Sequence, residues 1–303
     1  MANHEAGPVQ LPEVPSGPAR PLWYRAWRVV RRMTLSLLFI GGCLAIFLLL
    51  YQGRMIYFPR PYESHDRVAT DERLSEIDFK TAQGTQRAFY MASRDGSTPP
   101  TALWVVFSGN ATCALDWRFF AEDYPDDGAG FLLLDYPGYG DSKGTPSPRS
   151  ILDASNGALS ALAAHLSTDV PTLESRLHTL GHSLGAAASL QFAVQHPVRR
   201  VVIVSPFTSL KDMAGRVVGW PLKHVLIHNF DNRKRLDELA ARPEPPSVVV
   251  IHGAIDEIIP VQMGRELGSR HPSITKYVEI PGGDHNGILG IHEKSIWREM
   301  MGE

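Results

Sequence analysis

The stretch RLHTLGHSLGAAASLQFAVQ, residues 176–195, decides the fold. Its first five residues predict a short buried strand, and its alanine-rich second half predicts a helix. Between the two lies Gly181-His182-Ser183-Leu184-Gly185, a G-x-S-x-G pattern. A strand that ends at the first glycine and a helix that begins after the serine form a sharp turn, which lifts the hydroxyl above the edge of a sheet. The stretch therefore predicts an α/β fold with Ser183 as a nucleophile; a plain helix N-cap is the alternative role for this serine.

A second G-x-S-x-G pattern lies at Gly140-Asp141-Ser142-Lys143-Gly144. So short a pattern also arises by chance, and its context has to decide between the two. Ser142 is followed by Lys143-Gly144-Thr145-Pro146, which predicts a loop rather than a helix. We therefore interpret Ser142 as a turn residue.

Short apolar runs alternate with helical patterns on both sides of the deciding stretch, which is typical of a mostly parallel sheet with helices on both faces. An early antiparallel pair, joined through Gly84, brings the predicted sheet to eight strands. The strands are predicted at residues 75–79, 87–91, 102–107, 130–135, 177–180, 200–204, 248–252 and 275–280. The helices are predicted at residues 113–122, 149–166, 183–195, 262–269 and 287–300.

A serine hydroxyl is a poor nucleophile at neutral pH and needs a base, which is itself oriented by a carboxylate. On this kind of fold the chain order is serine, acid, histidine. Asp256 follows the strand at 248–252, and His285 follows the last strand, so both are predicted at the carboxyl edge of the sheet beside Ser183. Glu257 and Asp284 are the rival acids, and the direction of the His182 side chain stays open.

An oxyanion formed during acyl transfer needs two preorganised donors, normally backbone N–H groups. One is predicted at Leu184, the residue after the nucleophile. The other is predicted in the turn Ser108-Gly109-Asn110-Ala111 that follows the strand at 102–107, and we assign it to the N–H of Asn110.

An uncharged, mostly aliphatic run of 18 residues, TLSLLFIGGCLAIFLLLY at 34–51, follows an arginine cluster. A helix of this length, at about 1.5 Å per residue, nearly matches the roughly 30 Å hydrocarbon core of a bilayer. We predict a disordered basic tail at residues 1–32, a transmembrane helix at 33–53 and one catalytic domain at 54–303. A buried core helix is the alternative for the apolar run.

The basic residues indicate the orientation of this single-pass span. Five arginines precede the span and three follow it within a comparable distance, which favours a cytoplasmic N-terminus and a catalytic domain on the non-cytoplasmic side. Arg31-Arg32 weakly resembles a twin-arginine export signal, and Ile40-Gly41-Gly42-Cys43 loosely resembles a lipoprotein box, so removal of the segment is the competing fate.

Composition excludes several other classes of protein. The chain has 303 residues, of which 44% are hydrophobic, so it has material for a sizeable core. Its 30 Lys and Arg against 32 Asp and Glu give a net charge of -2, without the footprint of a nucleic-acid partner. Two cysteines, Cys43 and Cys113, make neither a disulfide scaffold nor a four-cysteine zinc site.

Taken together, these segments resemble the α/β-hydrolase superfamily, and more narrowly its membrane-anchored serine hydrolases, which are related to monoacylglycerol lipases and serine aminopeptidases. Further matching segments are Tyr57-Phe58-Pro59, Phe107-Ser108-Gly109-Asn110-Ala111, the DYPGYGDS run at 135–142 and Ser205-Pro206-Phe207-Thr208-Ser209-Leu210. Two positions depart from the pattern. Ser108 stands where such proteins usually have histidine, and Pro137 stands where many have arginine.

The resemblance implies a membrane-anchored serine hydrolase that cleaves carboxylic esters, lipid acyl esters among them, through an acyl-enzyme intermediate. Ser183, Asp256 and His285 form its triad, and the mechanism requires no metal and no organic cofactor. A small cap insertion is expected at about 207–246. A serine peptidase or thioesterase on the same triad is the alternative reading, as is a catalytically idle scaffold that binds a partner at the membrane.

Overall fold

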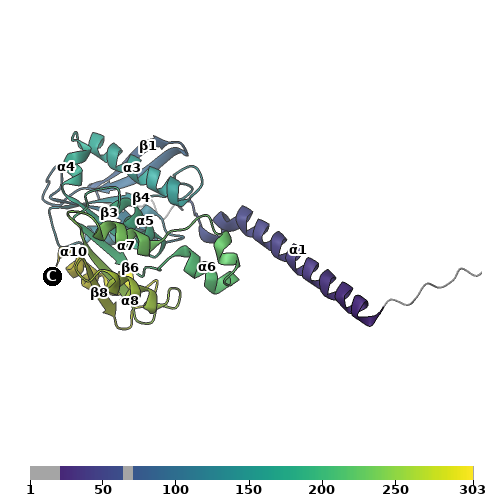
Figure 1. Cartoon of the computed structure of the whole chain (residues 1–303). Coiled ribbons are helices and arrows are strands. Elements are labelled where there is room, and N and C mark those ends of the chain that lie inside the picture. Colours follow the sequence, from purple (N-terminus) through teal and green to yellow (C-terminus); the bar gives the residue numbers. More distant parts are fainter. Residues whose placement is uncertain (1–20, 64–70, 303) are drawn as a thin grey trace, which may run out of the picture. The chain divides into compact units, whose positions relative to one another are not determined.

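The computed structural model describes residues 21–63 and 71–302. Two compact units meet in the chain between Phe47 and Leu48. Helix α1, Leu22–Ile56, begins in the first unit and ends in the second (Figure 1). Its 35 residues would extend about 52 Å at about 1.5 Å per residue, more than a bilayer core requires. Among the described residues, α1 is the one helix that is long and apolar enough to cross a membrane.

The start of α1 corrects one expectation. Residues 22–32, predicted as part of a disordered tail, are helical. Pro21 is the last of the closely spaced prolines, and a proline is tolerated at the start of a helix because its missing N–H would have no partner there. The leucine, arginine and alanine residues that follow are good helix formers. The remainder of the predicted tail, residues 1–20, lies outside the described part of the chain.

The second unit contains an eight-stranded sheet in the order β1-β2-β4-β3-β5-β6-β7-β8. Strand β2 is antiparallel to both of its neighbours, and the other pairs are parallel, which confirms the predicted sheet. The strands are β1 Leu74–Thr81, β2 Gly84–Met91, β3 Ala102–Phe107, β4 Ala129–Leu134, β5 Leu177–His182, β6 Arg200–Val204, β7 Ser247–Gly253 and β8 Thr275–Ile280.

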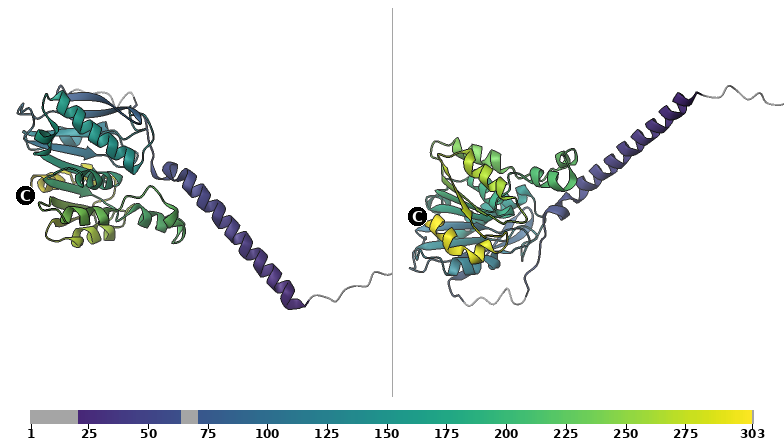
Figure 2. Two further views of the ribbon diagram at one scale, coloured as in Figure 1. Left: turned by 45° about the horizontal axis from the view of Figure 1, so that its top comes forward. Right: turned by 90° about the horizontal axis from the view of Figure 1, so that it is seen from below.

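Helices cover both faces of this sheet (Figure 2). Both faces need covering because successive side chains of a strand point to opposite sides of the sheet. In β3, Leu103 and Val105 pack into one core, and Trp104 and Val106 pack into the other. The first core also takes side chains from α3 Pro148–His165, α4 Val170–Glu174, α5 Leu184–Ala193, α7 Asn232–Ala240 and α8 Val261–Arg270. The second takes them from η1 Ala114–Trp117, α2 Arg118–Glu122, α9 Ile288–Ile291 and α10 Glu293–Met301.

The chain leaves the sheet between β6 and β7, where the cap insertion is expected. Ser209 and Asp231 pair as an isolated antiparallel bridge that closes the base of this excursion. Between them lie α6, Leu210–Val218, and the short 3-10 helix η2, Leu222–Val225. After the bridge, α7 returns to the core, in which its Leu236 and Leu239 are fully buried. The part of the predicted insertion that stands away from the sheet is therefore the chain between the two bridge residues, 210–230, which we call the α6–η2 segment.

Glycines 181 and 185 allow α5 to lie against the sheet. A Cβ on Gly185 would collide with the carbonyl oxygens of Phe107 and Ser108, and a Cβ on Gly181 would collide with the backbone of Gly185. Both obstacles are backbone atoms at the centre of the fold, so a side chain there cannot be accommodated by rotation of a neighbour.

We expect Gly185→Ala to lower the free energy of unfolding by about 3 kcal/mol, because the added methyl forces α5 away from β3. Denaturant titration of the full chain in detergent measures this change. Gly290→Ala in α9 is the matched control, since a Cβ there meets no atom within 4 Å and should change stability by no more than about 1 kcal/mol. Equal effects of the two substitutions would contradict this account of the turn.

Candidate active site

Ser183 occupies the turn between β5 and α5. Its backbone φ is 55° and its ψ is -115°, a region that residues other than glycine seldom adopt. The turn is held because the Ser183 N–H donates to the Val204 carbonyl, at 2.9 Å. This is the strand-turn-helix arrangement that the G-x-S-x-G pattern at 181–185 predicts. The hydroxyl consequently stands at the carboxyl edge of the sheet.

Two loops bring an acid and a base to the same edge. Asp256 follows β7, and His285 follows β8, the neighbouring parallel strand. The two loops pack closely, since Ile255 N–H donates to the Gly283 carbonyl at 3.1 Å. His285 Nδ1 lies 2.8 Å from Asp256 Oδ2, and His285 Nε2 lies 3.1 Å from Ser183 Oγ. The three side chains thus form one continuous hydrogen-bonded chain.

The carboxylate of Asp256 is inaccessible to solvent and well supplied with donors. The backbone N–H groups of Ile258 and Ile259 donate to its Oδ1 at 3.0 and 2.7 Å. Burial raises the pKa of the Asp256 carboxyl, but hydrogen bonds from His252, His285 and Ile259 outweigh burial and hold that pKa well below its ordinary value. Asp256 is therefore ionised, so it accepts from His285 Nδ1–H and leaves Nε2 free to accept from Ser183.

The rival acids serve other groups. Asp284 accepts a hydrogen bond from the backbone N–H of Gly287 at 2.5 Å, and Glu257 accepts one from the backbone N–H of His285 at 3.4 Å. In the described residues neither of these carboxylates is hydrogen-bonded to the His285 ring. The geometry thus favours Asp256 over both.

Two further histidines lie beside this chain, and sequence reasoning did not assign them a place. His182 is buried, with its ring centroid 4.8 Å from that of His285 and its Nε2 2.9 Å from the His285 carbonyl oxygen. Burial and the neighbouring His285 lower the pKa of His182 to about 3, so the ring is neutral and donates from Nε2. The fully buried His252 lies with Nε2 3.3 Å from Asp256 Oδ2 and 2.9 Å from the Ile259 carbonyl.

The two predicted oxyanion donors line the same cavity as Ser183 and His285. Leu184 is the first residue of α5, where backbone N–H groups have no partner within the helix. Within the described parts of the chain, no hydrogen-bond acceptor is found for the N–H of Leu184 or for that of Asn110. Both groups are consequently available to a bound oxyanion.

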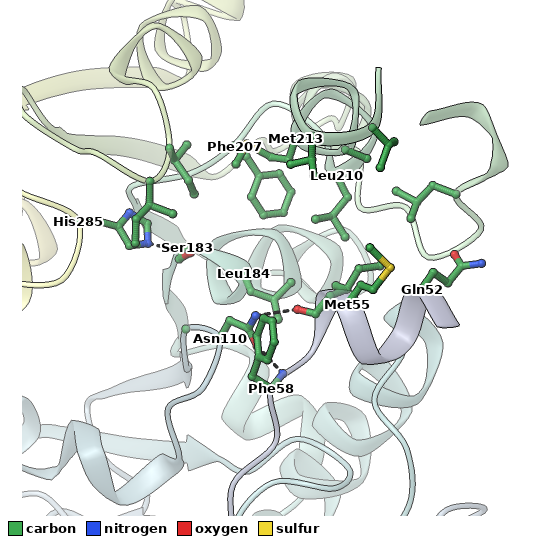
Figure 3. Close-up of a pocket in the computed structure, with 18 of the residues that line it drawn as sticks. Gln52, Met55, Phe58, Asn110, Ser183, Leu184, Phe207, Leu210, Met213 and His285 are labelled. Carbon is green, nitrogen blue, oxygen red and sulfur yellow. Dashed lines mark hydrogen bonds between the residues drawn. The ribbon is translucent and has the colours of Figure 1, made fainter. Parts of the chain in front are cut away.

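The Asn110 side chain ties its loop to the end of α1. Its Nδ2 donates to the Ile56 carbonyl at 2.6 Å, and its Oδ1 accepts from the Phe58 N–H at 3.0 Å and from the Tyr139 hydroxyl at 2.8 Å. Figure 3 shows Asn110 beside Phe58, with hydrogen bonds drawn as dashed lines. No local pattern in the sequence predicts these contacts, because they join residues that are 29 to 54 positions apart.

The run at 135–142 supports the same loop from below. The Tyr136 hydroxyl donates to the Ser108 carbonyl at 2.8 Å, so the loop is held although Ser108 replaces the usual histidine. Asp135 accepts from the Ala114 N–H at 2.8 Å and from the Tyr62 hydroxyl at 3.0 Å. Ser142 accepts from the Arg87 N–H at 3.0 Å inside a turn. Its interpretation as a turn residue is confirmed.

A cavity of about 480 Å³ opens beside Ser183 and His285. Polar groups gather at one end, at Ser183, His285 and Asn110, while the rest of the wall is formed mainly by aliphatic side chains of α6, η2 and α1. Figure 3 shows Ser183 and His285 at one end of the cavity, with Gln52 and Met55 away from them. This shape suits a ligand with one polar, reactive end and one apolar end.

The comparisons with known proteins agree with this fold and geometry. Residues 105–224 match a family model described as the alpha/beta hydrolase fold. The eight-stranded sheet, with a serine on the turn after β5, has the architecture of that fold. The chain belongs to the α/β hydrolase superfamily.

Several relatives extend over most of the chain. Protein Rv2307c of Mycobacterium tuberculosis, itself uncharacterised, is 30% identical over 251 residues, which cover 82% of this chain and 85% of the relative. The α/β hydrolase domain-containing protein WAV2 of Arabidopsis thaliana is 32% identical over 171 residues, 51% of this chain and 53% of the relative. The solved esterase Pf2001 of Pyrococcus furiosus has a TM-score of 0.59 at 12% identity, covering 81% of this chain and 95% of that chain.

The buried carboxyl of Asp135 predicts a specific pH dependence of stability. Burial raises the pKa of Asp135 from 3.8 to about 7, so between these pH values the folded chain keeps a proton that the unfolded chain has released. The contribution of the protonated Asp135 carboxyl to the free energy of unfolding is therefore complete below pH 3.8, and it is lost as the pH rises through about 7. We expect Asp135→Asn to remove this decline, which denaturant titrations across that pH range would measure. A variant that keeps the full slope of the wild type would disprove the assignment.

Proposed function

We propose that this protein is a membrane-anchored serine hydrolase that cleaves carboxylic esters through an acyl-enzyme intermediate. The observation that carries the proposal is the unbroken hydrogen-bonded chain from Ser183 Oγ through the His285 ring to Asp256. A serine held at a strained turn beside an imidazole that is hydrogen-bonded to an ionised carboxylate has the arrangement that activates a hydroxyl for acyl transfer.

In the proposed mechanism, Ser183 Oγ attacks the ester carbonyl carbon while His285 Nε2 takes the hydroxyl proton. The negative charge that develops on the carbonyl oxygen is held by the N–H groups of Leu184 and Asn110. His285 then passes the proton to the departing alkoxide, the carbon–oxygen bond breaks, and the acyl group stays on Ser183. His285 Nε2 takes a proton from a water molecule, and the water oxygen attacks the acyl carbon. The bond between that carbon and Ser183 Oγ then breaks, the carboxylic acid leaves, and His285 returns the proton to Ser183 Oγ. Asp256 stabilises the imidazolium during both halves.

The character of the cavity supports an ester with an apolar acyl group over a peptide. Its wall contains aliphatic side chains and neutral polar groups, and none of the described residues that line it is an aspartate or glutamate. A peptidase that trims N-terminal residues needs a negative group to bind the substrate ammonium. The lack of such a group among the lining residues weighs against an aminopeptidase and favours a lipase-like esterase. A thioester would fit the same groups.

Retention of α1 as an anchor is supported by its C-terminal end. Gln52 is 6% exposed although most of α1 is exposed, and the Ile56 carbonyl is held by Asn110. Cleavage on the C-terminal side of Gln52 would strip these contacts from the catalytic unit. We therefore propose a single-pass membrane protein, with the catalytic unit on the non-cytoplasmic side as the arginine distribution favours.

The test of the proposed chemistry is labelling of the detergent-solubilised full chain with a fluorophosphonate probe. We expect Ser183→Ala and His285→Ala to abolish labelling, and Asp256→Asn to lower kcat for p-nitrophenyl butyrate by about 10⁴-fold because the His285 tautomer is no longer fixed. Ser142→Ala, at the second G-x-S-x-G pattern, is the matched control and should label like the wild type.

If the folded wild-type protein does not label, the proposed hydrolase activity is wrong, and the alternative of a catalytically idle scaffold remains. A butyryl thioester and an aminoacyl p-nitroanilide, assayed beside the ester, distinguish an esterase from a thioesterase and a peptidase. Faster turnover of either of those substrates than of the ester would replace the ester assignment.

The membrane proposal has its own measurement. We expect the full chain to remain in the membrane fraction after extraction at alkaline pH and to keep the residues before the apolar run, rather than to start at Cys43 or later. N-terminal sequencing of the purified protein and protease protection of intact cells measure retention and side. Release into the soluble fraction with a shortened N-terminus would establish a cleaved signal.

A further inference from the structure

The far end of the catalytic cavity is formed by the C-terminal part of α1. Leu48, Gln52, Met55 and Ile56 all line the cavity, and all belong to the same compact unit as the catalytic side chains. Leu48 lies within the apolar run at 34–51, so the wall of the cavity and the apolar run share residues. The opposite wall is formed by α6 and η2, through side chains such as Leu210, Met213 and Val218.

Gln52 fastens these two walls together. Its Oε1 accepts hydrogen bonds from the backbone N–H groups of Ile227 and His228, at 2.8 and 3.0 Å. Its Nε2 donates to the Leu49 carbonyl at 3.0 Å. A buried amide with both polar atoms satisfied holds its partners firmly, because loss of either bond would leave polar groups buried without a partner. The distance between α1 and the α6–η2 segment is thereby set by one side chain.

Large apolar side chains are exposed on both of these walls. Met55 and Phe58 are 46% and 55% exposed, and Val217, Trp220 and Ile227 of the α6–η2 segment are 80%, 74% and 70% exposed. We call these five residues the apolar rim. Met55, Phe58 and Val217 line the cavity itself, while Trp220 and Ile227 flank η2 in the chain. Exposed apolar groups beside a ligand cavity mark an interaction surface, and tryptophan is favoured where protein meets the bilayer interface. Two of the rim residues, Met55 and Phe58, follow the apolar run within seven residues of Tyr51.

We infer that the substrate is an ester of a single long-chain fatty acid that resides in the membrane, and that its acyl chain lies between the end of α1 and the α6–η2 segment. The inference rests on the proposed esterase function. The ester group lies at Ser183, and the chain runs toward Met55, while the apolar rim rests in the bilayer interface and receives the substrate from it. A cavity of about 480 Å³ is in the lower half of the usual range of about 300–1,000 Å³, which favours one acyl chain over two.

The placement of the acyl chain predicts that chain-length preference is set on α1. Each methylene buried in the cavity should raise kcat/KM about fourfold until the cavity is full. In Met55→Trp the indole occupies the distal part of the cavity, so the ratio of kcat/KM for p-nitrophenyl palmitate to that for p-nitrophenyl butyrate should fall at least about tenfold. Leu50→Trp is the matched control, because Leu50 lies on the same helix, is 74% exposed and does not line the cavity.

Both variants and the wild type are assayed as full chains in the same detergent micelles, and each is labelled with the fluorophosphonate probe. If the wild type does not label, the proposed function has failed and the inference fails with it. If all three label and Met55→Trp keeps the wild-type chain-length ratio, the placement of the acyl chain is wrong while the esterase function stands.

Delivery from the membrane is tested with the full chain in phosphatidylcholine vesicles that contain 4-methylumbelliferyl oleate. We expect Trp220→Glu with Ile227→Glu to lower turnover of this ester at least about tenfold, because charge is costly at an apolar membrane contact. Phe119→Glu is the control, since Phe119 is 41% exposed on α2 and does not line the cavity. Equal turnover in the rim variant and the wild type would overturn the membrane contact and would direct attention to a protein partner for the rim.

Discussion

The close contact between α5 and the centre of the sheet is the constraint on which the site depends. Gly181 and Gly185 bring the backbone of α5 against β3 and β5, and the chain can make the turn between β5 and α5 only with Ser183 at a φ of 55°. The unfavourable backbone geometry is maintained because the surrounding core holds both the strand and the helix in place. As a result, the backbone of Ser183 is held in place and its hydroxyl lies within hydrogen-bond distance of His285.

The parallel sheet then accounts for the assembly of the other groups. The ends of β7 and β8 lie next to each other, so Asp256 and His285 come within hydrogen-bond distance although they are 29 residues apart. This is the reason that the fold and the three proposed catalytic residues could be predicted from the sequence. Strand ends, glycines and the order serine, acid, histidine are local signals, and a parallel sheet converts them into proximity.

Contacts that depend on long-range packing could not be predicted in the same way. The carboxamide of Asn110 was expected only to lie on a turn, yet it holds the carbonyl of Ile56 and the N–H of Phe58. From the sequence, His252 is only one more residue of an apolar strand. It becomes a partner of Asp256 because the loop after β7 folds back over it. The helical conformation of residues 22–32 was missed for a different reason. The closely spaced prolines before them suggested a disordered tail, and the leucine, arginine and alanine residues that favour a helix were given too little weight.

Gln52 shows how one helix can belong both to an apolar segment and to the unit that holds the candidate site. An amide at the end of an apolar run is costly in hydrocarbon unless its polar atoms are paired. Here the oxygen accepts from two N–H groups of the α6–η2 segment and the nitrogen donates to the carbonyl of Leu49, so the amide is both buried and satisfied. Residues 48–56 are therefore a structural part of the second unit, and another apolar helix without these contacts could not replace them. Loss of this segment would leave the N–H groups of Ile227 and His228 without their acceptor and would remove one wall of the cavity.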